Sequence, residues 1–218
     1  MDSATPPVIG RDFFDRARKK LTLEVPPALH DHSIADFARG DLDTDPAKWE
    51  QVGVTATRAA AVLVGVVDHS EPGVLLTMRT SDLPNHAGQI AFPGCKMDPH
   101  DATPLAAALR EADEEIGLGA ALIEPIGYLD LYLTFTGFRI LPVVARVIPS
   151  YELKINASEV ADAFEVPLAF VMDEANHKRA SRDWKGVRRE YYEMPFGERY
   201  IWGVTAGILR NLYEKIYG

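Results

Sequence analysis

Three glutamates near the middle of this chain have the type and spacing of metal ligands. Residues 110–117 read Arg-Glu-Ala-Asp-Glu-Glu-Ile-Gly, and helical spacing places Glu111, Glu114 and Glu115 on one face. Like charges at this spacing repel one another, and a hard divalent cation, which prefers carboxylate oxygens, would remove the repulsion. The octet predicts a metal-binding helix. A solvated acidic face, in which Arg110 pairs with Glu114, fits the same residues, and the octet alone does not choose between them.

The flanking residues predict a helix that follows a strand and a turn. Thr103 suits the N-cap, Pro104 the first helical position and Gly117 the helix end. Residues 91–94, Ala-Phe-Pro-Gly, indicate the end of a strand entering a turn. An apolar stripe at helical spacing predicts that one side of the helix is buried and that the carboxylates point elsewhere; its members are Leu105, Leu109, Ala112 and Ile116.

This strand, turn and helix resemble the signature of the Nudix hydrolases. Residues 110–118 match its second half, Arg-Glu-U-X-Glu-Glu-X-Gly-U with U apolar, at every position. In the first half, Cys95 stands where the signature has Gly, Asp101 stands where it has Glu, and the gap to Arg110 is one residue longer. A Cys would be strained there if the position needed a positive φ. The resemblance implies an α/β fold, an α/β/α sandwich around a mixed β-sheet, and hydrolysis of a diphosphate with Mg²⁺ or Mn²⁺.

A narrower resemblance points to one branch of that family. Residues 75–80 and 83–94 look like the segment that marks coenzyme A pyrophosphatases, and the stretch 202–208 is similar as well, whereas Pro84 stands where the branch has Arg. This implies cleavage of CoA or acyl-CoA to 3′,5′-ADP and 4′-phosphopantetheine or its acyl form. Two alternatives stay open: a Nudix hydrolase of another nucleoside diphosphate, such as ADP-ribose, and a catalytically weak domain that binds a nucleotide.

The resemblance also implies roles for individual residues. Glu111 and Glu115 would be the primary metal ligands, Glu114 would complete the cluster, and Arg110 would orient the carboxylates. Glu159 is the candidate for one further catalytic acid; a glutamate at a helix N-terminus is the alternative interpretation. Trp202 and Thr205 could contact the substrate, although a core position is favoured for Trp202. The remaining substrate-binding candidates are Arg79, His86, Gly88, Gln89, Gly94 and Lys96.

Composition limits the classes of partner. The chain has 218 residues, a formal net charge of −9, 47% hydrophobic residues and one cysteine. It shows no basic face for nucleic acid, no apolar run near the roughly 18 residues of a membrane span and no secretory signal, so we expect a cytoplasmic protein with a small-molecule substrate. The negative net charge disfavours binding of a polyanionic substrate by itself. Metal ions that bind together with the substrate would remove this repulsion.

The pattern along the chain predicts an N-terminal extension over residues 1–52 and a Nudix domain over residues 53–218. The basic end of a helix over 12–21 could contact a phosphate or a second copy of the chain; we favour a solvated face and leave a homodimer open. A short helical turn followed by a strand is expected over 160–168. Two hairpins, two late strands and a final helix are expected at 58–67 with 74–79, 126–133 with 139–147, 188–194, 199–202 and 206–217.

Overall fold

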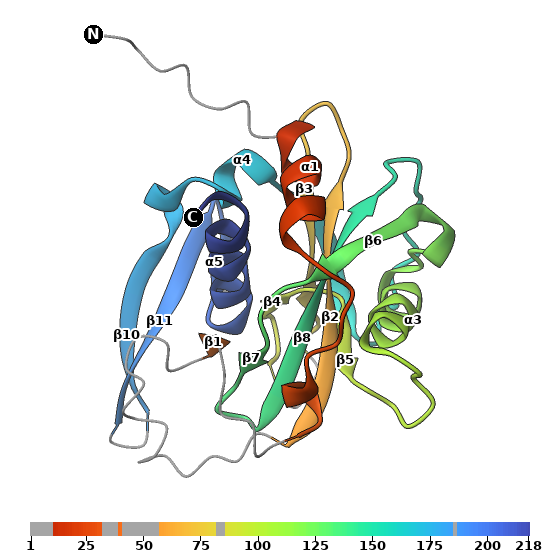
Figure 1. Cartoon of the computed structure of the whole chain (residues 1–218). Helices are drawn as coiled ribbons and strands as arrows, with labels where there is room; N and C mark the ends of the chain where they lie inside the picture. The colour runs from red at the N-terminus through yellow and green to blue at the C-terminus, as the bar shows by residue number, and fades with distance from the viewer. Residues whose placement is uncertain (1–10, 32–38, 41–56, 82–85, 185–186) are drawn as a thin grey trace, which may run out of the picture.

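The fold is α/β and centres on a nine-stranded mixed sheet (Figure 1). The computed structural model describes residues 11–31, 39–40, 57–81, 86–184 and 187–218. The helices are α1 (Arg11–Lys20), α3 (Pro104–Ile116), α4 (Leu168–Val171) and α5 (Val204–Tyr217), with 3-10 turns at Pro27–Leu29, Ala120–Leu122 and Glu174–Asn176. The strands are β1 (Arg39–Gly40), β2 (Arg58–Val67), β3 (Gly73–Arg79), β4 (Ile90–Ala91), β5 (Gly94–Lys96), β6 (Ile123–Tyr128), β7 (Tyr132–Leu133), β8 (Phe138–Val147), β9 (Val160–Pro167), β10 (Lys178–Trp184), β11 (Val187–Phe196) and β12 (Arg199–Trp202).

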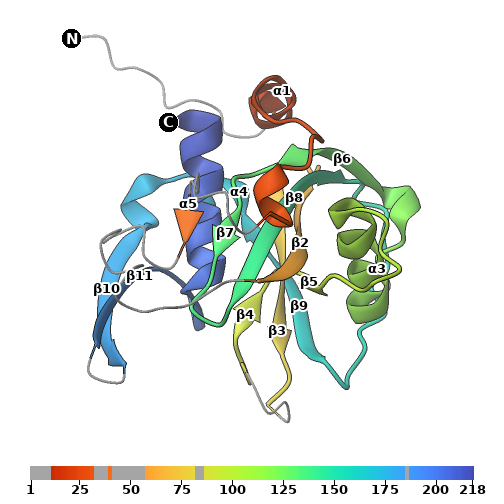
Figure 2. The ribbon, with the colours of Figure 1, turned by 60° about the horizontal axis from the view of Figure 1, so that its bottom comes forward.

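The large sheet opens between β2 and β3, and this opening carries the loop that leads to α3. These strands pair only beside their connecting turn, at Val66 with Val74 and Val67 with Gly73. Farther along, β2 pairs with β5 and β3 pairs with β4. On its other edge β3 pairs with β9, while β2 runs parallel to β8. The ends of β3, β4 and β9 therefore lie together (Figure 2).

Helices cover both faces of this sheet. On one face, α3 packs through Ala108, Ala112 and Ile116, which are fully buried with residues of β2 and β8. On the other face, α1 and α5 share a second core cluster. The three-stranded antiparallel sheet β10–β11–β12 lies on the far side of α5 and adds Met194 and Ile201 to that cluster (Figure 1).

Part of the expected N-terminal extension belongs to the same two cores. Phe13 and Ala17 of α1 are 0% exposed and join the cluster around α5. Leu29 is also 0% exposed and joins the cluster beneath α3. The boundary expected between residues 52 and 53 lies outside the described residues. Residues 11–31 thus bridge both faces of the sheet.

The sequence predicted most of these elements, but not all. The mixed sheet, α3, the hairpin of β2 with β3, the late strands and the final helix are confirmed. The order expected over 160–168 is wrong: β9 comes first and α4 follows, because residues 160–167 pair along β3. Strand β10 was missed, since its sequence Lys-Arg-Ala-Ser-Arg-Asp-Trp offers little apolar alternation. Among the helices of the described residues, none is long and apolar enough to span a membrane.

Candidate active site

Local sequence fixes both ends of α3. The Thr103 side chain accepts a hydrogen bond from the Ala106 N–H at 3.0 Å, and Pro104 occupies the first turn. Gly117 ends the helix at φ 68°, and its N–H donates back to the last turn. The helix therefore begins and ends where the sequence predicts.

The three glutamates of α3 do not share one environment. Glu111 and Glu115 are 8% and 3% exposed and lie on the buried side of the helix, whereas the Glu114 side chain is 56% exposed. The expectation that the carboxylates point away from the buried side is therefore wrong for two of the three. Positions i and i+4 are only about 40° apart around a helix, so Glu111 and Glu115 are buried together when that side of the helix packs against the protein.

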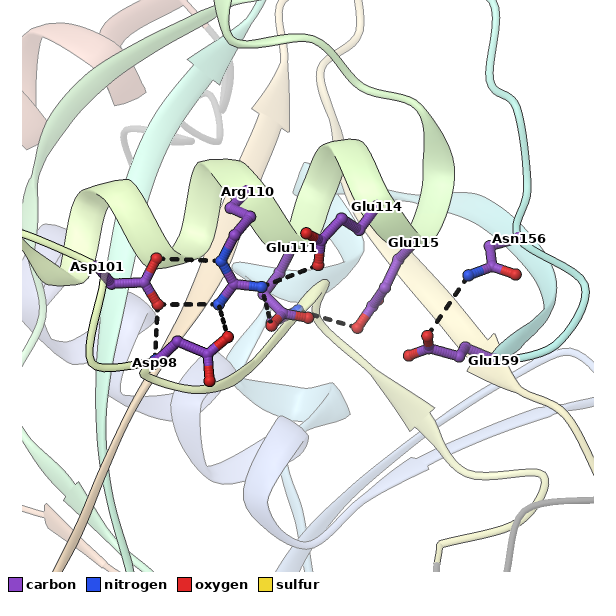
Figure 3. Close-up of polar contacts among 9 residues, drawn as sticks. Asp98, Asp101, Arg110, Glu111, Glu114, Glu115, Asn156 and Glu159 are labelled. Atoms are coloured by element: carbon purple, nitrogen blue, oxygen red, sulfur yellow. Dashed lines mark hydrogen bonds and ion pairs between the residues drawn. The ribbon is translucent and has the colours of Figure 1, made fainter.

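Arg110 donates hydrogen bonds to three carboxylates, those of Asp101, Glu111 and Glu114. Its Nε and Nη2 donate to Asp101 at 3.0 and 2.9 Å, and its Nη1 donates to Glu111 at 2.7 Å and to Glu114 at 2.8 Å (Figure 3). The hydrogen bond from Arg110 lowers the pKa of Asp101. The sequence marked Asp101 only as a departure from the signature; in the structure it anchors the arginine.

Among the carboxylates of the site, Glu115 is the one whose negative charge is least balanced by nearby hydrogen-bond donors and cations. Burial is the largest cause that raises its pKa, to about 7, and nearby Glu111 adds to the shift. The Gly94 N–H donates to Glu115 Oε1 at 3.4 Å, which lowers the pKa but does not offset burial. Burial also raises the pKa of Glu111, while Arg110 lowers it. A cation at Glu115 would supply the charge that the protein does not.

Glu159 reaches the same region from the loop before β9. Its carboxylate lies close enough to raise the pKa of both Glu111 and Glu115, and all three lie on one side of α3 (Figure 3). Asn156, which the sequence did not indicate, links the two segments: its N–H donates to the Glu115 carbonyl at 2.9 Å, and its side-chain amide donates to Glu159 Oε1 at 3.4 Å. Because a strand follows Glu159, the alternative of a helix N-terminus is wrong.

Arg79 and the turn that closes on it lie beside Glu115. The Arg79 guanidinium lowers the pKa of Glu115, and its Nε is buried without a hydrogen-bond partner in the described part of the chain. Gly88 N–H donates to the Arg79 carbonyl, and Arg79 N–H donates to the Gln89 carbonyl. His86, at φ 59°, lies 2.8 Å from Gln89 through Nδ1 and Oε1. An unsatisfied buried donor beside a carboxylate cluster is suited to an anion.

Comparison with known proteins agrees with this geometry. A sequence model described as the NUDIX domain matches residues 56–189. A protein of Cronobacter sakazakii described as "Uncharacterized Nudix hydrolase NudL" is 41% identical over 159 residues, which cover 73% of this chain and 83% of that protein. Its counterpart in Escherichia coli strain K12 is 38% identical over the same shares. The chain belongs to the Nudix family.

Solved Nudix structures resemble the fold more distantly. A MutT/Nudix family protein from Enterococcus faecalis gives a TM-score of 0.47 at 13% identity, covering 80% of this chain and 69% of that one. The NUDIX domain of Shewanella oneidensis NrtR, complexed with ADP ribose, gives 0.42 at 23% identity, covering 60% and 82%. Family membership rests on the sequence matches. It makes the protein a Nudix hydrolase, which acts on diphosphate bonds of nucleoside diphosphate derivatives with divalent cations.

The carboxylates of this site have the chemistry that such a cation binds, although Arg110 already donates hydrogen bonds to Glu111 and Glu114. Among the described residues, no three His, Cys, Asp or Glu side chains are gathered as an ion would gather them. Carboxylate oxygens are nonetheless what Mg²⁺ and Mn²⁺ prefer, and Glu115 is buried without a full counter-charge. Glu111, Glu115 and Glu159 can supply oxygens from one side of α3, with Glu114 farther out.

The departures from the Nudix signature are compatible with this backbone. Cys95 lies in β5 and is not among the residues with positive φ, so the strain considered for a cysteine there is absent. Partial desolvation is the main cause that raises the pKa of its thiol, which argues against a reactive thiolate. Lys96 beside it is exposed, and Pro84 lies outside the described residues.

The two candidates near the C-terminus differ. Thr205 is 6% exposed and its hydroxyl donates to the Ile90 carbonyl at 2.9 Å, so it links α5 to β4. Trp202 is partly exposed, not core, and its ring lies 5.5 Å from that of Tyr191.

Proposed function

We propose that this Nudix hydrolase cleaves the diphosphate of CoA or an acyl-CoA, giving 3′,5′-ADP and 4′-phosphopantetheine or its acyl form. The observation that carries the proposal is the segment over residues 75–80 and 83–94, which resembles the CoA branch. Arg79 and the backbone of Gly94, both from this segment, lie beside Glu115. An arginine fork suits a phosphate oxygen, and a glycine lets the backbone approach it. Gly88 and Gln89 close the turn on Arg79, and His86 is held by Gln89.

In this proposal, Glu111 and Glu115 bind Mg²⁺ or Mn²⁺ and Glu159 adds a third carboxylate. When bound, the cation neutralises charge on the diphosphate and makes the attacking water more acidic. Arg110, fixed by Asp101, holds Glu111 in place and keeps Glu114 near it. Arg79 and Lys96 would pair with phosphate oxygens, so the chain can bind a polyanion despite its net charge of −9.

Product analysis tests the reaction and the site together. The protein is incubated with CoA and Mg²⁺ or Mn²⁺, and products are identified by mass spectrometry. We expect 3′,5′-ADP and 4′-phosphopantetheine from the wild type, and a loss of about 100-fold or more in kcat/KM for Glu115→Gln because a metal-binding oxygen is replaced by an amide. The matched control is Asp113→Asn, an exposed carboxylate on the same helix, which we expect to leave the rate within about twofold.

Two results would count against the proposal. Full activity of Glu115→Gln would overturn the metal-site assignment. Turnover of ADP-ribose in place of CoA would overturn the substrate and favour the wider class of nucleoside diphosphates, whereas tight nucleotide binding without any turnover would favour a binding domain.

A further inference from the structure

Arg199 on β12 is held in an arrangement that leaves part of its guanidinium available. Its Nη2 donates to Asp162 Oδ2 at 2.8 Å, and its Cζ lies 3.4 Å from the ring centroid of Phe164. Within the described residues these are its only side-chain partners, and its side chain is 33% exposed. The carboxylate and the ring fix the guanidinium plane, while Nε and Nη1 have no acceptor in the part of the chain that the structure describes.

Four other arginines are neutralised more completely. Arg110 contacts Asp101, Glu111 and Glu114, as described above. Two or more carboxylates also contact Arg39, Arg146 and Arg210. Arg199 differs because an aromatic ring occupies one face of its guanidinium and a single carboxylate takes one edge. An arginine stacked in this way keeps its charge and loses little freedom when it binds an anion.

Strand β9 connects Arg199 to the candidate active site. Asp162, its ion-pair partner, follows Glu159 by three residues, at most about 10 Å along a strand. In the register of the sheet, Asp162 pairs with Met78 and Val160 pairs with Arg79. The strand β12 that carries Arg199 contacts β4, the strand that precedes Gly94. The ion pair with Asp162 therefore places Arg199 beside the end of β9 that follows Glu159.

We propose that Arg199 forms a second phosphate subsite, which binds the 3′-phosphate on the ribose of CoA. The inference rests on the CoA activity proposed above. Beyond its diphosphate, CoA carries one further anionic group, this phosphate, whereas its pantetheine arm is neutral. A fixed arginine beside the end of β9 that follows Glu159 matches that group in charge. ADP-ribose lacks it, so Arg199 would favour CoA over that substrate.

The test compares CoA with dephospho-CoA, which lacks only the 3′-phosphate. For Arg199→Gln we expect kcat/KM for CoA to fall more than kcat/KM for dephospho-CoA, so that their ratio drops about tenfold, mainly through KM. Arg199→Lys keeps the charge but loses the fork, and we expect it to recover part of the ratio. Arg182→Gln is the matched control: this exposed arginine of β10 belongs to the same small sheet and should leave the ratio unchanged.

An unchanged ratio in Arg199→Gln, with or without a general loss of activity, overturns the subsite. If the wild type does not hydrolyse CoA, the proposed function fails, and the subsite is then tested by binding. Calorimetry with adenosine 3′,5′-bisphosphate and with AMP measures the same phosphate without turnover. A wild-type preference for the bisphosphate that Arg199→Gln removes supports the subsite; equal affinity of the wild type for the two nucleotides overturns it.

Discussion

Glu115 is the carboxylate of this site whose charged form is most strongly disfavoured by its surroundings. It is 3% exposed, receives a single 3.4 Å hydrogen bond from Gly94 and lies near two other carboxylates. Burial removes the water that would stabilise its charge, and Glu111 and Glu159 add repulsion, so its pKa rises to about 7. Arg79 offsets only part of this. Such a residue favours a bound cation over an empty site.

The metal-free protein should therefore lose stability as the pH rises toward 8. The carboxyl has a pKa of about 7 in the folded protein against an ordinary value of 4.5, so between these values the folded state binds more protons than the unfolded state. The free energy of unfolding therefore falls as the pH rises from about 4.5 to about 7, by about 3 kcal/mol in total, and changes little outside that range.

Urea unfolding in EDTA, at several pH values between about 5 and 8, measures this effect. Glu115→Gln stays neutral at every pH, so its stability should fall less steeply than that of the wild type. Parallel curves for the two proteins would show that Glu115 titrates as an ordinary surface carboxyl, and its burial would then give no reason for cation binding. Adding Mg²⁺ should stabilise the wild type more at pH 8 than at pH 6, because the ligand must be deprotonated.

At the scale of elements, the first residue of β5 lies very close to β2. Gly94 has φ 145°, and a Cβ there would lie 2.6 Å from Val62 Cα and closer still to the Ala61 carbonyl. We expect Gly94→Ala to lower the free energy of unfolding by about 2 kcal/mol or more and to reduce activity, because the strand must shift and the N–H that reaches Glu115 moves with it.

Cys95→Gly is the comparison for that variant, one residue along the same strand. Cys95 has no positive φ, so restoring the signature glycine should leave kcat/KM within about twofold and cost about 0.5–1 kcal/mol of stability through added backbone freedom. Thermal unfolding and the CoA assay measure both. A Gly94→Ala protein as stable and active as Cys95→Gly would contradict the close approach.

These elements also show which features the sequence could predict. Helix α3 was predicted end to end because its caps, Thr103 and Gly117, are local signals. The unequal burial of Glu111 and Glu114 was not predictable, since it depends on where β5 and β9 meet the helix. For the same reason Asn156 escaped notice: its role comes from joining the end of α3 to Glu159 across a loop. Strand β10 carries mostly polar side chains, and only pairing with β11 defines it.

Across the whole molecule, the N-terminal helix belongs to the core that supports the site. Phe13 is 0% exposed and packs edge-on against Phe14 at 5.5 Å between ring centroids. Both belong to the cluster that also holds Leu212 and Ile216 of α5. That cluster extends under β3 and β9 through Leu76 and Val166, the two strands that carry Arg79 and Asp162. Packing by α1 is thereby connected to the positions of β3 and β9.

Phe13→Ala should therefore destabilise the whole fold and not only its N-terminus. Removing a fully buried phenyl ring leaves a cavity and costs about 3–5 kcal/mol, a large fraction of the stability of a domain of this size. Leu23→Ala is the matched control, because Leu23 is 46% exposed and should cost about 0.5 kcal/mol or less. Chemical denaturation followed by tryptophan fluorescence measures both. One cooperative transition shifted to lower denaturant indicates a shared core, whereas an early, separate loss of α1 with the main transition unchanged would mean that residues 11–31 are an extension on which the Nudix fold does not depend.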